Sequence, residues 1–310
     1  MAIDRRTFLI GGAAVGVVAV GAVGGGFLVE AGVLPGRSKL DEALGRCGSM
    51  LEPPDVVTGP VITGTFSSSA RNGSDVGWTV VYPPGSSPGD ALPVCLFLHG
   101  RGGSNADSTG SMQLPRFLAG VVADDGVAPF AIASVDGGDA TNWHRRSDGD
   151  DPPAMIAGEL LPLLASKGLD VGRLAFWGVS LGGTGALYLA TLPDFEPAGV
   201  MAASPALWRE PGEWQAGAYD DEVDFEDNSL WNRLDLLDGV NLRIDCGESD
   251  PFASRVRQFC DGLNPTPAGG IEPGCHDNRF WSRQTPAEIA FVGAALAEAA
   301  RPMDGTPNGI

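Results

Sequence analysis

Apolar residues gather in short continuous runs separated by longer segments with helical spacing. The runs PVCLFL at 93–98 and LAFWGV at 174–179 are typical of strands buried on both faces of a sheet. The whole pattern predicts strands over 61–66, 77–82, 93–98, 130–135, 174–179, 199–203 and 241–246, and helices over 154–165, 181–192, 251–260 and 286–300. Alternation of strands and helices favours an α/β class, with a mostly parallel sheet covered by helices on both faces.

Two segments depart from this alternation. An Asn-Gly pair at 72–73 is a turn signal and predicts that the first two strands form a hairpin. The stretch 205–239 carries Trp208, Trp214 and Trp231 among many acidic residues. A long connection inside a domain is either a functional segment such as a lid or a helical surface insertion, and the sequence leaves both readings open.

The N-terminus has the features of an export address. Arg5 and Arg6 precede an apolar run, and no charged residue occurs from Phe8 to Val29. This arrangement resembles a twin-arginine signal, and the alternative is a plain membrane helix of sufficient length. We expect export by the twin-arginine translocase to the envelope or the medium, with membrane contact only through this segment if it is not cleaved.

The remaining chain is long enough for one sizeable domain. We assign 1–31 to the signal or anchor, 32–56 to a polar, Pro/Gly-rich linker, 57–303 to the α/β domain and 304–310 to a tail. The formal charge of −19 repels phosphate backbones, so nucleic acid is excluded as a partner.

Cysteine and histidine usage limits the metal chemistry. The five cysteines include no CxxC pair and the chain has only three histidines, which argues against a structural zinc site. The glycines at 100–103 have the wrong spacing for a nucleotide-binding loop, and we infer no cofactor. In an exported protein one disulfide is plausible, and we expect Cys260 to pair with Cys275.

The chain contains two G-x-S-x-G patterns, at 85–89 and 178–182. Ser87 lies beside prolines in a turn, with no strand before it and no helix after it. Ser180 follows an apolar strand directly and opens a helix, which is the setting of a nucleophile elbow. We therefore interpret Ser180 as a candidate nucleophile.

A serine hydroxyl needs a base, and the candidates are His99, His144 and His276. His276 lies before the last helix and satisfies the chain order serine, acid, histidine. His99 ends a strand in a glycine-rich loop of the kind that supplies an oxyanion N–H, and we expect it to orient that loop.

The acid should follow the strand at 241–246. Asp245, Glu248 and Asp250 compete for this role. Asp250 is favoured because it lies just past the strand, at a helix start from which a carboxylate reaches a neighbouring loop. Glu248 is the second candidate, and either carboxylate could instead be a helix cap.

Four motifs occur in one order, LHGRGG at 98–103, GVSLGG at 178–183, DCGESDPF at 245–252 and PGCHDNRFW at 273–281. Together they resemble the esterase group of α/β-hydrolases that includes S-formylglutathione hydrolases, enterochelin and feruloyl esterases and mycolyltransferases. The resemblance covers roughly residues 60–300 and is greatest to exported actinobacterial members. It implies the α/β-hydrolase fold and a carboxylic ester hydrolase.

By this resemblance Ser180 is the nucleophile, Asp250 the acid and His276 the base. The oxyanion N–H groups would come from Arg101 and Leu181.

The resemblance also implies that the segment after the strand at 130–135 lines the active-site cleft. Its candidates for substrate contact are Asp139, Trp143 and His144, together with His99. The expected substrate is a small-molecule or lipid ester. The alternatives are an acyltransferase of the mycolyltransferase type, a serine peptidase, and a non-catalytic envelope-binding protein on the same fold.

Overall fold

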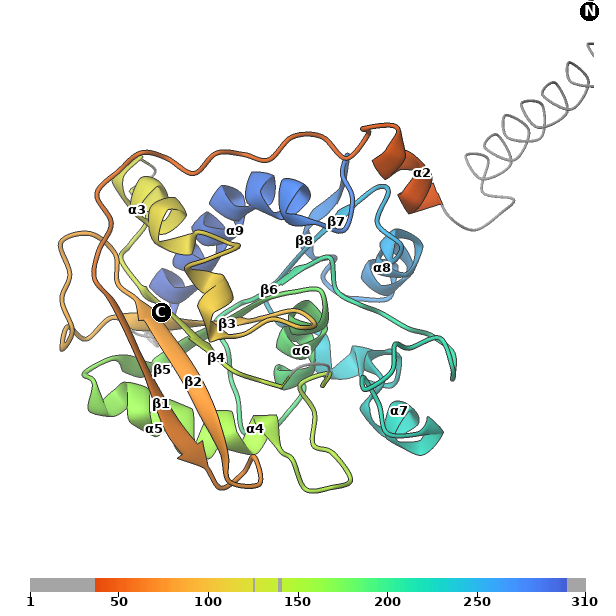
Figure 1. Ribbon diagram of the computed structural model, residues 1–310, viewed down its shortest axis with the longest axis horizontal. Coiled ribbons are helices and arrows are strands. Elements are labelled where there is room, and N and C mark those ends of the chain that lie inside the picture. The colour runs from red at the N-terminus through yellow and green to blue at the C-terminus, as the bar shows by residue number, and fades with distance from the viewer. Residues whose placement is uncertain (1–36, 125, 139–140, 300–310) are drawn as a thin grey trace, which may run out of the picture.

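A computed structural model describes residues 37–124, 126–138 and 141–299, and Figure 1 shows its elements. The strands are β1 (Val61–Ser68), β2 (Ser74–Val81), β3 (Pro93–Leu98), β4 (Ala131–Val135), β5 (Asp170–Val179), β6 (Val200–Ala203), β7 (Leu242–Gly247) and β8 (Ala268–Glu272). The helices are α2 (Arg37–Ala43), α3 (Leu114–Asp124), α4 (Pro152–Met155), α5 (Leu161–Ser166), α6 (Leu181–Leu189), α7 (Glu222–Asn228), α8 (Ala253–Asp261) and α9 (Asn278–Glu298).

All eight strands form one sheet in the order β1-β2-β4-β3-β5-β6-β7-β8. The predicted hairpin is present: β2 pairs antiparallel with β1 and also with β4. From β4 to β8 every neighbouring pair is parallel. The loops that follow the parallel strands therefore meet along the carboxyl ends of these strands, where α/β proteins bind their ligands.

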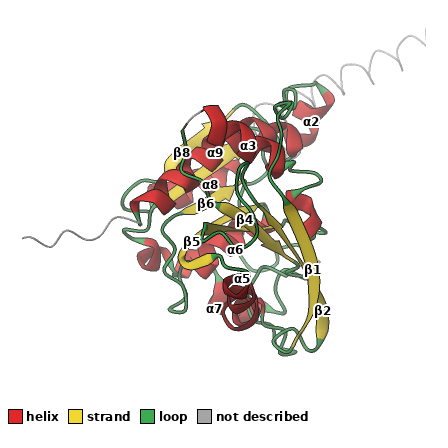
Figure 2. Ribbon diagram, turned by 90° about the vertical axis from the view of Figure 1, so that its left-hand side faces the viewer, coloured by secondary structure: helices red, strands yellow, loops and turns green. Residues whose placement is uncertain are grey.

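Helices cover both faces of the sheet, as Figures 1 and 2 show. Successive residues of a strand point to opposite faces, so Leu96 and Leu98 of β3 pack with α5, α6 and α8. Cys95 and Phe97 point the other way and pack with α3 and α9. Because these side chains are fully buried, the continuous apolar run of β3 is explained by burial on both faces.

The ends and edges of the fold differ most from the predicted elements. α9 begins at Asn278 rather than at 286, because the side chain of Asp277 caps it by accepting from the N–H groups of Arg279 and Phe280. Pro286, expected at the first turn, lies inside the helix. The pattern did not predict β8, a largely exposed edge strand of sequence AGGIE, nor helices α3 and α7.

The predicted disulfide is wrong, since Cys275 bonds Cys47. Cys260 lies on α8, where it is a half-buried free thiol that packs against the main core. The segment 37–60 contains α2 and runs along the α3–α9 side of the molecule before it enters β1 (Figure 1). The disulfide joins this segment to the domain.

None of the described helices is long and apolar enough to cross a membrane. The apolar run at 8–29 and the twin-arginine pair before it lie outside the described residues.

Candidate active site

Ser180 lies at the sharp turn between β5 and α6. Its backbone has φ 55°, a region that costs a non-glycine residue roughly 1–3 kcal/mol. The turn is possible only between small neighbours. A Cβ on Gly178 would lie 2.0 Å from the carbonyl oxygen of Gly182, and a Cβ on Gly182 would lie 2.0 Å from that of Leu98. The flanking glycines of the G-x-S-x-G pattern are therefore required by backbone contact, and they fix where the Ser180 hydroxyl points.

His276 lies in the loop between β8 and α9, where its ring meets Ser180. The His276 Nε2 atom is 2.9 Å from Ser180 Oγ, and Nδ1 is 2.7 Å from Asp250 Oδ2. The Asp250 side chain is completely buried, and its other oxygen accepts from the Phe252 N–H at 2.8 Å. The three residues interpreted as nucleophile, base and acid thus lie in one hydrogen-bonded row.

The two competing carboxylates point elsewhere. Asp245 is buried and pairs with Arg243 at 2.7 Å, and burial raises the pKa of its carboxyl despite this partner. Glu248 is exposed, on the turn after β7. The Nδ1 atom of His276 therefore meets Asp250 and neither of the others.

Two aromatic rings enclose the imidazole of His276. Its centroid lies 5.3 Å from that of Trp281 and 5.6 Å from that of Phe252. Both residues belong to the motifs around the acid and the base, and their position beside Asp250 and His276 in sequence is the signal that could have identified them. The rings restrict rotation of the imidazole, which helps to keep Nε2 directed at Ser180.

His99 organises the loop after β3. The N–H of Gly137 donates to His99 Nε2 at 3.0 Å, so Nδ1 carries the proton and donates to the carbonyl of Gly100 at 2.8 Å. Burial lowers the pKa of His99, although its hydrogen bond to Gly100 opposes this effect. A neutral, fully engaged imidazole is suited to orienting the loop and not to taking a proton from Ser180.

The loop that His99 orients passes directly over the nucleophile. Gly103 N–H closes a turn onto the carbonyl of Gly100 at 3.1 Å, and a Cβ on Gly100 would lie 3.3 Å from the Cβ of Ser180. Arg101 lines the pocket at Ser180, and its guanidinium donates to the side chain of Gln215. Leu181 is the first residue of α6, so its N–H has no acceptor within the helix.

Two pockets meet at Ser180 and His276. One, of about 300 Å³, extends toward Arg101, Met112 and Trp281. The other, of about 460 Å³, is lined by residues that include Leu181, Trp208, Phe252 and Arg255. Gln215 belongs to both linings. An ester bond at Ser180 could therefore extend a group into each pocket.

The insertion 205–239 forms part of these walls and part of the core. Trp208 packs with Leu181, Tyr219 and Phe225 in a small buried cluster. The indole N–H of Trp231 donates to the carbonyl of Trp208 at 2.8 Å, and its ring packs edge-on against Phe259 of α8. Sequence reasoning left the role of this insertion open and did not identify Gln215, which carries no local signal.

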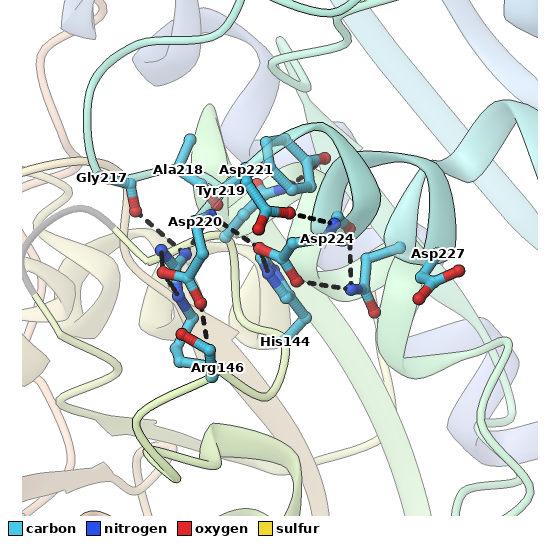
Figure 3. Close-up of polar contacts among 12 residues, drawn as sticks. His144, Arg146, Gly217, Ala218, Tyr219, Asp220, Asp221, Asp224 and Asp227 are labelled. Atoms are coloured by element: carbon cyan, nitrogen blue, oxygen red, sulfur yellow. Dashed lines mark hydrogen bonds and ion pairs between the residues drawn. The ribbon is translucent and has the colours of Figure 1, made fainter.

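His144 and Arg146 hold the insertion in place, as Figure 3 shows. His144 is buried and its Nε2 atom lies 2.9 Å from a carboxylate oxygen of Asp224. Burial raises the pKa of Asp224, but the hydrogen bonds from His144 and from the Asp220 N–H outweigh it and bring this pKa below its ordinary value. Arg146 Nε donates to Asp220 at 3.1 Å and its Nη1 to the carbonyl of Ala218 at 2.8 Å.

Three of the four candidates for substrate contact lie among the described residues, and none of them lines the two pockets at Ser180. His99 and His144 make the structural contacts described above. The Trp143 ring is buried in van der Waals contact with Gly137 and Gly185, where a side chain on either glycine would overlap it. Asp139 lies outside the described residues.

Solved structures of similar shape are named as esterases or hydrolases. A ferulic acid esterase superposes with a TM-score of 0.65 at 20% identity, covering 76% of this chain and 98% of the other. A fluorophosphonate-binding serine hydrolase of Staphylococcus aureus gives 0.64 at 17%, covering 76% and 99%. An S-formylglutathione hydrolase from Agrobacterium tumefaciens gives 0.61 at 17%, covering 80% and 99%. These likenesses show that the fold is that of the α/β-hydrolases.

No curated protein sequence matches the chain. The sequence profile of one family, described as Putative esterase, matches residues 69–259. That stretch is more than half of the 310 residues and contains the serine elbow and the aspartate. The chain belongs to this esterase family and is a hydrolase with the α/β-hydrolase fold.

Proposed function

We propose that the protein is a serine-dependent carboxylic ester hydrolase that works through an acyl-enzyme. The observation that carries the proposal is the row of hydrogen bonds from Asp250 through His276 to Ser180, built on a strained elbow at the carboxyl end of β5. An alcohol is a weak nucleophile at neutral pH, and a neighbouring imidazole that takes its proton removes this limitation.

In the first step the Ser180 oxygen attacks the ester carbonyl carbon while its proton moves to His276 Nε2. Asp250 accepts a hydrogen bond from Nδ1 and stabilises the imidazolium that forms. The N–H groups of Arg101 and Leu181 would bind the oxyanion, and losing one such donor typically lowers kcat about 10²–10³-fold. The alcohol leaves with the proton from His276, and water then repeats the sequence to release the acid.

Hydrolysis is favoured over transfer by the exposure of the base. The His276 side chain is 24% exposed, so bulk water reaches the group that must activate it in the second step. The pocket lined by Trp208 and Phe252 could also admit an acceptor alcohol, which would make the protein an acyltransferase. Hydrolysis and transfer are distinguished by analysing the products that form from an activated ester when alcohols are added. Free acid alone supports the hydrolase, and a new ester supports the acyltransferase.

The neighbouring structures are named as a ferulic acid esterase and an S-formylglutathione hydrolase, so their names give different substrates. We propose a small-molecule or lipid ester, with its two parts in the two pockets. A non-catalytic binding protein on the same fold is disfavoured because the three side chains are in hydrogen-bonding contact.

We also propose that the protein acts outside the cytoplasm after twin-arginine export. The support is the Arg5-Arg6 pair before the apolar run and the Cys47–Cys275 disulfide, since such bonds persist in oxidising compartments. Replacing both arginines by lysine should leave the protein in the cytoplasmic fraction. Unchanged export of that variant would contradict the proposal.

The test of the reaction uses the purified protein beside Ser180→Ala and His276→Ala. Each is incubated with a fluorophosphonate probe and with p-nitrophenyl esters of increasing acyl length. Labelling and turnover in the wild type that are lost in both variants would support the proposal. Equal labelling of Ser180→Ala would show that another residue is the nucleophile, and a folded wild type without labelling would favour the binding protein.

A further inference from the structure

We propose that the N-terminal segment 37–51, which lies outside the stretch matched by the family, positions the active site. It holds both the loop that carries Asp250 and the loop that carries His276. This inference rests on the proposed function, because it assigns roles to residues that act through the acid and the base. The segment contacts the chain beside each of these two residues.

The first contact lies beside the acid. Asp41 of α2 is only 2% exposed, and the hydroxyl of Ser249 donates to one of its carboxylate oxygens. Arg46 donates to the other oxygen at 3.1 Å, within the same segment. Ser249 is itself buried and directly precedes Asp250. A carboxylate buried against a hydroxyl in this way fixes the backbone from which the acid projects.

The second contact lies beside the base. Cys47 is fully buried and forms the disulfide with Cys275, the residue directly before His276. Arg283 of α9 adds to this junction, because its Nη1 donates to the carbonyl of Ser49 at 2.7 Å and its Nη2 to that of Pro273 at 2.8 Å. One guanidinium therefore joins the segment, the base loop and α9.

The two catalytic loops also contact each other. The Ser249 N–H donates to the carbonyl of Gly274 at 2.9 Å. A Cβ on Gly247 would lie 2.6 Å from that same carbonyl, so the end of β7 and the base loop approach as closely as backbones allow. A shift of either loop would consequently change the distance between Asp250 and His276.

The base loop needs outside support because little apolar packing precedes it. It follows β8, an edge strand that among the described strands pairs with β7 alone and whose residues are all exposed or half-buried. Reacting groups in enzymes must be placed within a fraction of an ångström, and a 1 Å displacement can lower the rate about 10²-fold. The disulfide and the Asp41 contact supply this placement from one continuous segment.

The test compares variants that release the segment at different points of the full-length protein. Cys47→Ser combined with Cys275→Ser removes the covalent bond beside the base and leaves the Arg283 hydrogen bonds in place. Asp41→Ala removes the contact beside the acid, whereas Asp41→Asn keeps an oxygen for the Ser249 hydroxyl. The matched control is Arg116→Ala, since Arg116 Nε holds a later part of the same chain by donating to the carbonyl of Pro54 at 2.9 Å and lines neither pocket.

Two readouts are used on variants that keep the wild-type circular dichroism spectrum. The first is the rate at which a fluorophosphonate labels Ser180. The second is the downfield proton resonance of the His276 Nδ1–H that bonds Asp250. We expect the double serine variant and Asp41→Ala to label on the order of 10- to 100-fold more slowly, with a shifted or broadened resonance. Asp41→Asn should recover most of the rate, and Arg116→Ala should lose thermal stability and label at the wild-type rate.

Wild-type labelling and an unchanged resonance in both releasing variants would overturn the proposal and leave the segment a purely structural attachment. Slow labelling of Arg116→Ala to the same extent would also overturn it. If the double serine variant does not fold, the Asp41→Ala and Asp41→Asn pair decides. A wild type that is labelled and cleaves no ester refutes the proposed function alone, and the resonance tests the positioning even if no probe reacts.

Discussion

Replacing Asp250 by asparagine should reverse the direction of hydrogen bonding through His276. One oxygen of Asp250 accepts from the Phe252 N–H at 2.8 Å, and the other faces His276 Nδ1 at 2.7 Å. An asparagine has one oxygen, and the backbone N–H of the half-buried Phe252 can be satisfied only by an acceptor. The amide –NH₂ would then face Nδ1, so Nδ1 must accept and the proton must move to Nε2.

A proton on Nε2 prevents His276 from accepting the proton of Ser180, although the geometry is preserved. In a triad of this kind the change lowers kcat about 10⁴-fold, which corresponds to about 5 kcal/mol of transition-state stabilisation. The matched control is Glu248→Gln, the same chemical change two residues earlier on an exposed side chain. We expect that control to keep wild-type activity.

The assay measures kcat with p-nitrophenyl acetate for wild type and both variants, after thermal unfolding confirms that each is folded. A loss of less than about tenfold in Asp250→Asn would refute the assignment of the acid, because the tautomer argument requires a loss of several orders of magnitude. An equal loss in Glu248→Gln would indicate that the loop, and not the Asp250 carboxylate, controls the rate.

Three further outcomes follow from the packing and the charges. Gly182→Ala should destabilise the fold by about 1–3 kcal/mol in urea unfolding and reduce labelling of Ser180, since its Cβ would lie 2.0 Å from a backbone oxygen. Burial, and then the charge of Asp245, raise the pKa of Glu288. The unfolded chain releases this proton first, at about pH 4.3, so the wild type should lose stability as pH rises above that value. Glu288→Met should gain stability relative to the wild type over the same pH range, which melting curves at several pH values can check. Although burial opposes it, hydrogen bonding to Ser147 and Arg146 lowers the pKa of Asp220 to about 2, so Arg146→Ala should lose stability at neutral pH. The difference in melting temperature should narrow as pH falls from about 4 to 2, leaving the part due to the Arg146 hydrogen bonds to the carbonyls of Gly217 and Ala218.

Local sequence was sufficient where chemistry depends on neighbours in the chain. The strand, glycines and helix around Ser180 define the elbow within a dozen residues, and the small number of histidines left His276 as the one in the expected chain order. The central strands were predicted for the same reason, since burial on both faces produces a continuous apolar run such as that of β3.

Prediction was weakest where a residue's role depends on a distant partner. Cys47 and Cys275 are 228 residues apart, and no spacing rule indicates that they meet. His144 lies in a segment that the resemblance led us to expect at the cleft, but Asp224 of the insertion engages it. The sequence favoured Asp250 over Glu248 without excluding Glu248, and the hydrogen bond from His276 to Asp250 supports that preference.

The difference between the well-predicted elbow and the poorly predicted partner contacts reflects where the catalytic groups lie in the sheet. Ser180 projects from β5, which has β3 and β6 as neighbours, so its position is held by the core itself. The acid follows β7, the strand next to the edge of the sheet, and the base follows β8, the edge strand, which among the described strands pairs with β7 alone. A site assembled from the centre and the edge of one sheet requires extra contacts only on the edge side. Two contacts of the segment 37–51 lie on that side, with Ser249 beside Asp250 and with Cys275 beside His276.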